Sequence, residues 1–361
     1  MARRKKTVTK TETSIVLLNK PPMRTFFFCL LFANIYMAAE PLKTNENKPF
    51  NEFDAYIRNC PDHEENSIQS IAAYINRSAK TDLEKARGVY VWLTDNISYN
   101  DKGYNSHNFG DNSAEGVLKS RVAVCAGYAD LFEAIAKNTG IEAISIVGYA
   151  KGNNYEEGDH FSESNHVWNA VKIDNAWRIF DATWGEGGGV KDKKGRLKSI
   201  KEFNDHWFNV SPEQAVFTHY PENPMELFTT QKITLEDFES LPDVSPDYLR
   251  QGFLTAEEIL AKLKTKKPII LPILFPVDGE YSIRKAPKER TLTIGKLIEF
   301  EIECNEPDLK FFLLDENQIW KPLKRNNGNY IERYTPMVSG DLKIIVQSSS
   351  GTYVLMRYIV E

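Results

Sequence analysis

The chain has 361 residues and a formal net charge of −5, so it carries no overall basic field that would hold nucleic acid. Its hydrophobic content of 42%, with 26% charged residues, is that of a globular protein and excludes general disorder. The length exceeds that of one ordinary hydrophobic core, and we therefore expect two domains.

The N-terminal segment has the layout of a secretory signal peptide. Residues 23–39, "MRTFFFCLLFANIYMAA", place one arginine before an apolar run that ends on small residues. Translation could start at Met1 or at Met23, and both starts predict an exported protein, in the periplasm, in the cell envelope or secreted. The run is short for a bilayer span, so an uncleaved anchor is the alternative, and we expect no stable transmembrane span after cleavage.

Helical patterns come first along the rest of the chain. "SIQSIAAYINRSA" spaces its apolar residues as a helix does, and Thr81 with Glu84 forms a capping box for a second helix that ends near residue 96. Residues 101–112 are rich in glycine and asparagine and predict a loop, after which Ser113 caps a short helix. A further helix starts at Cys125 and closes at Gly140.

Beyond this helix the pattern changes to that of strands. "IEAISIVGYAKG" predicts one strand, and "NHVWNAVKI" and "WRIFDATW" predict a hairpin around the two-residue turn Asp174–Asn175. "GEGGG" and "KDKKGRLK" predict an exposed excursion. From about residue 268 short alternating runs predict an all-β sandwich without helices, and "TKKPIILPILFP" is the expected linker.

These patterns predict an α+β protein in three parts. Residues 1–39 form the N-terminal extension and signal peptide, residues 40–265 the candidate catalytic domain, and residues 266–361 the β-sandwich domain. After removal of the signal, three cysteines remain, so at least one stays a free thiol or pairs with another chain, and a Cys60–Cys304 bridge stays open. No C-x-x-C pair occurs, and we expect neither a metal nor a cofactor.

Three residues have the chemistry of a thiol nucleophile and its helpers. A helix N-terminus lowers the pKa of a thiol such as Cys125, an imidazole such as His166 takes the proton, and a carboxylate such as Asp181 fixes the ring. With a two-residue turn in the hairpin, Trp168 faces Asp181, and His166 is the diagonal neighbour of Asp181 on the same face. An odd-length turn would place His166 and Asp181 on opposite faces.

Each of the three residues also has a purely structural interpretation. A lone cysteine is most often a small buried hydrophobe, His166 could be a hydrogen-bonded sheet histidine, and Asp181 could cap the loop that follows it. Their combination favours the catalytic interpretation. The weaker rivals, in polar loops or at the hairpin tip, are His160, His107 and Asp174.

Several segments resemble the transglutaminase-like superfamily, and more narrowly the branch that contains kyphoscoliosis peptidase and the cytokinesis protein Cyk3. They are "AVCAGYADLFEAIAKNTGIEAISIVGYAKG", "NHVWNAVKIDNAWRIFDATWGEG" and "HWFNVSPEQAVFTHYPENPMELFTTQKITLEDFESLP", and the likeness runs from about residue 65 to 242. "APKERTLTIGKLIEFEI" also resembles the start of the β domain that follows the core in that branch. One departure is Ala123, where the family commonly has glycine.

The resemblance implies a papain-like α+β core with the nucleophile on a central helix packed against an antiparallel sheet. It assigns Cys125 as nucleophile, His166 as base and Asp181 as the orienting carboxylate. It places the oxyanion hole at the Cys125 backbone N–H and an upstream donor. Tyr99 is the candidate for that donor, and Trp168 and Trp184 are candidates for the walls of a substrate groove, with aromatic packing as the alternative for all three residues.

From the three residues and the resemblance together we expect an exported cysteine peptidase or amidase that works through a thioester, with hydrolysis favoured over transamidation. The alternative is a catalytically weak or inactive binding or scaffold protein. The expected partner is a protein or peptide substrate, with protein or cell-envelope contacts through the β domain. The calcium dependence of animal transglutaminases is not carried over, because no loop matches a calcium motif.

Overall fold

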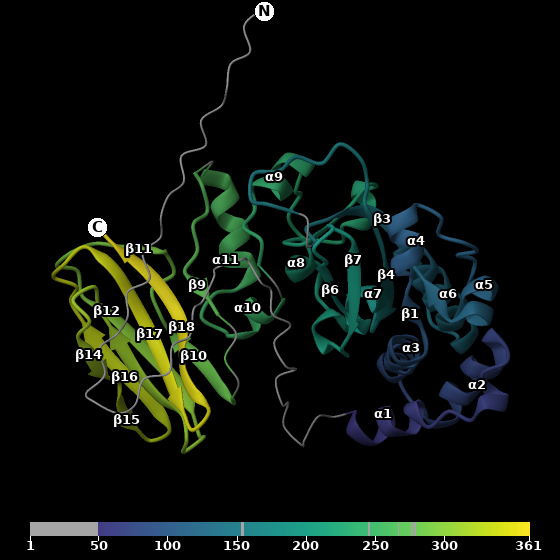
Figure 1. Ribbon diagram of the computed structural model, residues 1–361, viewed down its shortest axis with the longest axis horizontal. Helices are drawn as coiled ribbons and strands as arrows, with labels where there is room; N and C mark the ends of the chain where they lie inside the picture. The colour runs from purple at the N-terminus through teal and green to yellow at the C-terminus, as the bar shows by residue number, and fades with distance from the viewer. Residues whose placement is uncertain (1–49, 153–154, 245, 266, 276, 278) are drawn as a thin grey trace, which may run out of the picture.

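The computed structural model describes residues 50–152, 155–244, 246–265, 267–275, 277 and 279–361. Helices of the N-terminal half lie at one end of the elongated molecule and the C-terminal strands at the other, with a mixed region between them (Figure 1). The expected signal peptide and the choice between Met1 and Met23 lie outside the described residues. Within those residues, no helix combines the length and the apolar character needed to cross a bilayer.

Six α-helices and one short 3-10 helix precede the central sheet in the described chain. Capping boxes start two of them, at Ser67 and at Thr81, because each hydroxyl accepts the N3 amide while the N3 side chain accepts the cap's own N–H. The helices and the short parallel strand pair among them are α1 (Asn51–Arg58), η1 (Asp62–Glu64), α2 (Ile68–Ser78), α3 (Asp82–Asn96), β1 (Ser98–Tyr99), α4 (Asp101–Ser106), α5 (Ala114–Ser120), β2 (Val122–Ala123) and α6 (Cys125–Thr139).

The presence of α4 corrects one sequence prediction. Residues 101–112 were expected to form a loop, but the Asn100 side chain accepts the Gly103 N–H at 2.8 Å and caps a helix there. His107 ends that helix with a left-handed φ of 53°. Composition predicted the loop because glycine and asparagine are weak helix formers, whereas the local cap decided the structure.

The central sheet is antiparallel and carries the strands of the predicted hairpin. Its order is β5 (Ala176–Phe180), β4 (His166–Ile173), β3 (Ala143–Ala150) and β8 (His219–Pro221). Helix α6 packs on one face, where Asn169 donates to the Ala129 carbonyl at 3.0 Å. The opposite face buries Ile146, Trp168 and Ile179 against the segment after the hairpin.

The segment after the hairpin is more ordered than the sequence predicted. The predicted exposed excursion after Trp184 is a mostly exposed β-hairpin joined to α4, with Asn105 donating to the Leu197 carbonyl at 2.8 Å. The elements of this region are α7 (Ala182–Glu186), β6 (Gly187–Lys191), β7 (Leu197–Lys201), η2 (Asp205–Trp207), α8 (Pro212–Ala215), η3 (Pro224–Glu226), α9 (Leu235–Ser240), α10 (Pro246–Arg250), α11 (Ala256–Leu260) and η4 (Ala261–Thr265).

Two antiparallel-rich sheets form the C-terminal region, as the alternating runs predicted. Strand β12 alternates buried and half-buried residues from Ile298 to Cys304, which is the pattern of a strand with one face in a core. The first sheet has the order β10 (Tyr281–Lys285), β12 (Ile298–Cys304), β16 (Asn329–Tyr334), β15 (Lys324–Asn326). The second has the order β11 (Thr291–Leu292), β18 (Gly351–Val360), β17 (Gly340–Ser348), β13 (Lys310–Leu314), β14 (Trp320–Pro322), with β9 (Ile273–Leu274) on β18.

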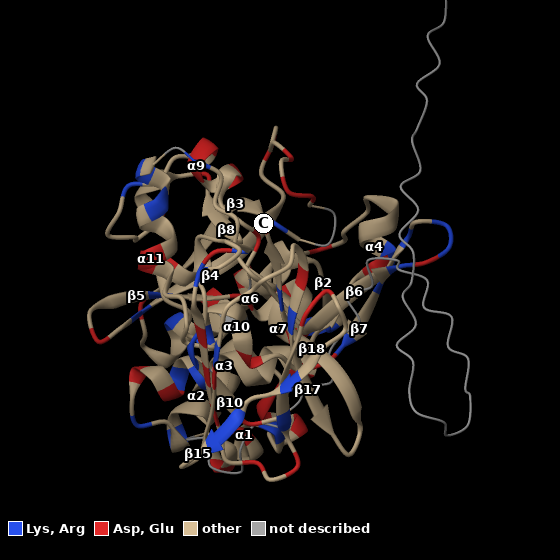
Figure 2. Ribbon diagram, turned by 90° about the vertical axis from the view of Figure 1, so that its left-hand side faces the viewer, with Lys and Arg blue, Asp and Glu red and all other residues tan. Residues whose placement is uncertain are grey.

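The α+β fold class with a β-rich C-terminal region is therefore confirmed. One hydrophobic cluster joins these C-terminal strands to residues from Val216 to Leu260, ahead of the predicted boundary at residue 265. The domain boundaries themselves stay a prediction. Acidic and basic residues are interspersed along the ribbon, although α9 itself carries acidic residues and no basic ones (Figure 2).

The cysteines of the described chain are all free thiols. Cys304 is buried in the C-terminal region, and Cys60 and Cys125 are partly buried in the N-terminal half. The Cys60–Cys304 bridge that the sequence left open is thus not formed.

Candidate active site

Cys125 is the first residue of α6, directly after its N-cap, Val124. The N-cap side chain makes no hydrogen bond to the helix, so the amides of the first turn and the helix dipole act toward the thiol. His166 and the Val167 backbone N–H lie close enough to the Cys125 thiol to act on its pKa. Burial by itself raises the pKa of this thiol, but the contacts with His166 and Val167 outweigh burial and lower the pKa below its ordinary value.

The Val167 amide is available because β5 is short. Pairing between β4 and β5 runs from Ile173 with Ala176 to Asn169 with Phe180, and β5 ends there. The backbone position that would face Val167 belongs to α7, which starts at Ala182. The Val167 N–H therefore has no partner on β5, and it is one of the groups that lower the pKa of the Cys125 thiol.

The second contact of the site joins His166 to Asp181. The distance from His166 Nε2 to Asp181 Oδ2 is 2.7 Å, and both side chains are almost fully buried. Since Nε2 is held by the carboxylate, Nδ1 is the nitrogen left for Cys125. Burial works against a charged imidazole, yet the charge and hydrogen bond of Asp181 and the contact with Cys125 raise the pKa of His166 to about 10.

The register behind this contact is the one the sequence predicted. Asp174 and Asn175 form a two-residue turn with φ of 49° and 64°, and both values are left-handed as a type I′ hairpin requires. The even turn keeps His166 and Asp181 on one face of the hairpin. Sequence alone thus predicted which three side chains meet.

Asp181 differs from the prediction in its element. It lies one residue beyond β5 and is the N-cap of α7, where Oδ1 accepts the Thr183 and Trp184 amides at 2.9 and 3.0 Å. The capping role that the sequence offered as an alternative is therefore present together with the contact to His166. Burial raises the pKa of the Asp181 carboxyl, but His166 and the other donors more than offset it and hold the pKa well below its usual range.

Of the two tryptophans that the sequence suggested as groove walls, Trp168 packs in the core and Trp184 lies at the edge of the site. Trp168 is 2% exposed and belongs to the core on its face of the sheet, where it lines a small pocket and not an open groove, so the packing alternative holds. Trp184 is half-buried and stacks on His166 with ring centroids 5.2 Å apart. Trp207, which sequence reasoning did not single out, packs on Trp184 at 4.8 Å.

Tyr99 lies near the cysteine, on strand β1. Strand β1 pairs in parallel with β2, which leads into Cys125 through Val124. Burial, followed by the charge of Cys125, raises the pKa of the Tyr99 phenol. This places Tyr99 within electrostatic range of the nucleophile, and its role as oxyanion donor stays a prediction.

The structure separates the weaker rivals from the site. His160 is exposed and pairs with Glu239 through Nδ1 at 2.6 Å, His107 ends α4, and Asp174 is at the hairpin tip. His219, by contrast, was not considered from sequence and lies in the site, with Nε2 3.1 Å from Asp181 Oδ2. Nothing in local spacing signals it, because β8 reaches the site across β3.

Among the described residues, one group has ligand atoms close enough together to hold a metal ion. It consists of His166, Asp181 and His219, whose ligand atoms lie within 4.8 Å of one another. Both histidine Nε2 atoms already share Asp181 Oδ2, at 2.7 and 3.1 Å. The trio is thus satisfied as a hydrogen-bonded carboxylate between two imidazoles. The expectation of no metal stays a prediction.

The fold and the site define an α+β domain in which a helix-borne cysteine lies beside a strand-borne histidine, and the histidine is hydrogen-bonded to an aspartate. Residues 69–182 match the family model of the transglutaminase-like superfamily. This part of the chain is therefore similar to the transglutaminase-like superfamily, as the sequence motifs implied.

Sequence relatives point to the same group. Kyphoscoliosis peptidase of Mus musculus is 25% identical over 289 residues, which are 79% of this chain and 39% of the relative. Cytokinesis protein 3 of Schizosaccharomyces pombe is 26% identical over 272 residues, 69% of this chain and 29% of the relative. The chain thus spans about two-fifths or less of the length of these relatives.

Similarity to solved structures is weaker. Alignment with the crystal structure of red sea bream transglutaminase covers 85% of this chain and 56% of that chain, with 9% identity and a TM-score of 0.27. The likeness to the superfamily accordingly rests on the sequence comparisons.

Proposed function

We propose that the protein is a cysteine hydrolase or acyltransferase that attacks an amide or peptide carbonyl through Cys125. The observation that carries this proposal is the continuous contact from the Cys125 thiol to His166 and from His166 Nε2 to Asp181, with a thiol pKa below its ordinary value. A thiolate beside an imidazolium is the reactive form of a cysteine nucleophile.

The reaction that this arrangement supports has two halves. In the first, the Cys125 thiolate forms a bond to the carbonyl carbon, the carbon–nitrogen bond breaks, and His166 gives its Nδ1 proton to the leaving amine. In the second, water gives a proton to His166 and attacks the thioester, and the carbon–sulfur bond breaks. The acid leaves, and the thiolate and imidazolium are restored. Asp181 keeps the ring oriented through both halves.

Water is the acceptor that we propose first. An amine could take its place in the second half and give transamidation, but no feature of the described residues selects an amine. The name of the relative kyphoscoliosis peptidase supports bond cleavage, although only 39% of that protein is matched. The substrate that we propose is a protein or peptide.

A generic acyl donor tests the proposal without a known substrate. p-Nitrophenyl acetate should place one acetyl group on Cys125, seen by intact-protein mass and peptide mapping, and the group should leave again in water. The matched control is the Cys60→Ser/Cys304→Ser double variant, which should acetylate like the wild type, while Cys125→Ala should not. Faster deacylation with an added alkylamine, and the amide as product, would show transamidation instead of hydrolysis.

The competing function is a binding or scaffold protein that uses the surface around Cys125 or the C-terminal sheets for contacts. It is kept because some relatives, the cytokinesis proteins, are named for a cellular process and not for an activity. The complete set of Cys125, His166 and Asp181 favours the enzyme. A Cys125 that acquires no acetyl group and reacts as slowly as an ordinary thiol would support the scaffold.

We also propose that the protein is exported, on the pattern of residues 23–39. Expression of the full chain and of a form that starts at residue 40 in a bacterial host, followed by fractionation, tests this. The full chain should appear outside the cytoplasm with a new N-terminus near residue 40. Retention of an intact full chain in the cytoplasm would contradict export.

A further inference from the structure

The Asp181 carboxylate accepts four hydrogen bonds. The bond from His219 belongs neither to the reaction described above nor to the cap of α7. Oδ1 takes the two amides of α7, and Oδ2 takes His166 Nε2 at 2.7 Å and His219 Nε2 at 3.1 Å. The His219 side chain is 1% exposed, and the Asp181 side chain is fully buried. A second imidazole therefore shares the oxygen on which His166 depends.

The fold brings His219 to this position from the far side of β3. His219 pairs with Ala150, and Gly148 of β3 pairs with His166 on one side and with Pro221 on the other. A Cβ at Gly148 would lie 2.6 Å from the Trp168 ring, so the glycine leaves the space in which that ring packs against His219, at a centroid distance of 4.9 Å. The two histidines can therefore approach one carboxylate across an intervening strand.

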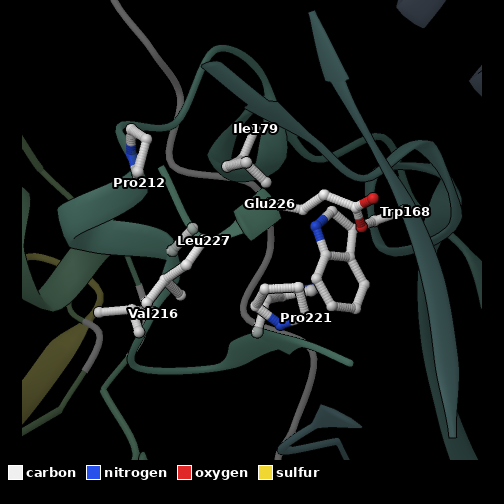
Figure 3. Close-up of a pocket in the computed structure, with 9 residues that line it drawn as sticks. Trp168, Ile179, Pro212, Val216, Pro221, Glu226 and Leu227 are labelled. Atoms are coloured by element: carbon white, nitrogen blue, oxygen red, sulfur yellow. The ribbon is translucent and has the colours of Figure 1, made fainter. Parts of the chain in front are cut away.

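The surroundings of His219 are aromatic. Its ring lies 4.5 Å from Trp184 and 4.9 Å from Trp207 between ring centroids. It also lines a small pocket, and Figure 3 shows this pocket with Trp168, Pro221 and Glu226 on its wall. The titratable groups facing His219 are thus Asp181 and His166, with Glu226 on the wall of the pocket.

The protons of His219 follow from its two contacts. Nε2 faces an anionic carboxylate and must carry a proton, so Nδ1 decides the charge. Nδ1 lies 2.9 Å from Thr218 Oγ1, and that hydroxyl is also 3.2 Å from the Ala215 carbonyl. A neutral ring accepts the hydroxyl proton at Nδ1, whereas a charged ring donates to Oγ1 and sends the hydroxyl proton to Ala215.

Both arrangements satisfy every donor, so electrostatics decides between them. Burial lowers the pKa of His219, and the positive charge of the nearby His166 lowers it further. The hydrogen bond and charge of Asp181 raise the pKa of His219 but do not outweigh burial, so this pKa lies below its ordinary value. His219 is accordingly a neutral donor while His166 is the charged ring. A neutral donor on Oδ2 partly compensates the negative charge of the same oxygen that stabilises the His166 imidazolium.

We propose that His219 is a positioning residue of this site, which shares Asp181 Oδ2 with His166 and thereby sets how readily His166 releases and takes back its proton. The proposal rests on the proposed function, because it concerns the base of that reaction. Without His219, Asp181 would stabilise the His166 imidazolium alone and more strongly. The base would then be harder to deprotonate when water must be activated.

The test compares His219→Phe, which keeps a ring but removes the donor, with His219→Gln, which keeps an N–H near the position of Nε2. All variants carry Cys60→Ser and Cys304→Ser. The pH dependence of deacetylation after p-nitrophenyl acetate reports the deprotonation of His166 in the acyl-enzyme. His219→Phe should move this inflection to higher pH by about half to one unit. His219→Gln should bring it back toward the wild-type value.

Two results would overturn the proposal. One is an unchanged inflection in His219→Phe, which would make the residue a packing element. The other is an equal loss of rate in the Phe and Gln variants together with an equal fall in melting temperature, which would make its role structural. If His219→Phe does not fold, His219→Met carries the test, because its flexible side chain fills a similar space but has no N–H to donate to Asp181 Oδ2. Its inflection should also rise, and an unchanged value would count against the proposal.

A second measurement distinguishes failure of the proposed function from failure of the role of His219. If wild-type Cys125 never acquires an acetyl group, the pH dependence of its alkylation by iodoacetamide still reports the thiolate–imidazolium pair. A more strongly held imidazolium favours the thiolate, so His219→Phe should move the acid limb of that curve to lower pH. An unmoved acid limb would overturn the role of His219, whatever the catalytic activity of the protein.

Discussion

Asp181 holds His166 Nε2 at 2.7 Å while its other carboxylate oxygen caps α7. One side chain therefore fixes both the base and the start of the helix that carries Trp184. The two roles can be separated by substitution, because they use different oxygens of the carboxylate.

Asp181→Asn should lower the rate of acetylation by p-nitrophenyl acetate on the order of 10⁴-fold, with little loss of stability. Its amide oxygen can still cap α7, but its NH₂ group then faces Nε2 of both histidines and forces His166 into the wrong tautomer. Asp181→Ala should lose activity and also about 1 kcal/mol of cap energy in urea unfolding. Activity of Asp181→Asn within tenfold of the wild type would show that the carboxylate is not part of the machinery.

The pH dependence of Cys125 alkylation follows from two shifts of opposite sign. The pKa of the thiol is lowered and that of His166 is raised to about 10, so the thiolate–imidazolium pair should persist from below the ordinary thiol pKa up to about pH 10. Iodoacetamide at pH 7 should then modify Cys125 selectively. Burial raises the pKa of Cys60 to about 11 and also raises that of Cys304. Peptide mapping that finds equal labelling of the three thiols would contradict this assignment.

Tyr99 can be tested as an oxyanion donor by comparing two reactions of the same thiol. Acetylation builds negative charge on the carbonyl oxygen, whereas alkylation by iodoacetamide builds none. Tyr99→Phe should therefore slow acetylation by about 10²-fold and leave alkylation unchanged. Equal slowing of both reactions would mean that the tyrosine acts on the thiol itself and not on the oxyanion.

The parts of the site that sequence predicted depend on short-range rules. The even turn at Asp174–Asn175 fixed the register of His166 and Asp181, and the helix that starts at Cys125 followed from apolar periodicity and the glycine at its end. The contact of His219 depends instead on β8 pairing with β3, and strand order in a sheet is not encoded locally.

Two other differences have similarly physical causes. Helix α4 was missed because its composition favours a loop while the Asn100 cap favours a helix, and the cap prevailed. Trp168 and Trp184 were equal candidates for groove walls in the sequence. The segment around Trp207 and Val210 covers the strand of Trp168, so of these two residues Trp184 alone keeps an exposed edge. Burial by a distant segment is a tertiary property.

Arg87 connects the N-terminal helices to the segment after the hairpin. Its guanidinium, 2% exposed, donates to both oxygens of Asp54 and to Asp205 at distances of 2.5 to 2.8 Å. Arg87→Met should cost about 3–5 kcal/mol in urea unfolding, because it leaves the Asp54 carboxylate buried without a partner. The double variant Arg87→Met/Asp54→Leu should recover most of that loss. A double variant as unstable as the single one would show that the arginine stem, and not the charge, provides the stability.

Glu186 gives the stability of the fold a pH dependence near neutrality. Its side chain is almost fully buried behind the site, 4.0 Å from Lys201, and the Tyr99 backbone N–H is close enough to favour its ionised form. Burial raises the pKa of its carboxyl to about 7. The folded state therefore keeps a proton that the unfolded chain loses at lower pH. The free energy of unfolding should fall as pH rises from about 4.5 to about 7, by at most about 3 kcal/mol from this residue.

Glu186→Gln removes the titration and keeps an oxygen for the Tyr99 amide. Urea unfolding of this variant between pH 5 and pH 8 should show a flatter profile than the wild type, with the variant relatively more stable at pH 8. Lys201→Met is the matched control: it removes the nearby positive charge that favours the ionised carboxylate, so it should steepen the fall in stability. Parallel pH profiles for the wild type and Glu186→Gln would show that Glu186 is ionised in the folded protein, with its charge fully compensated.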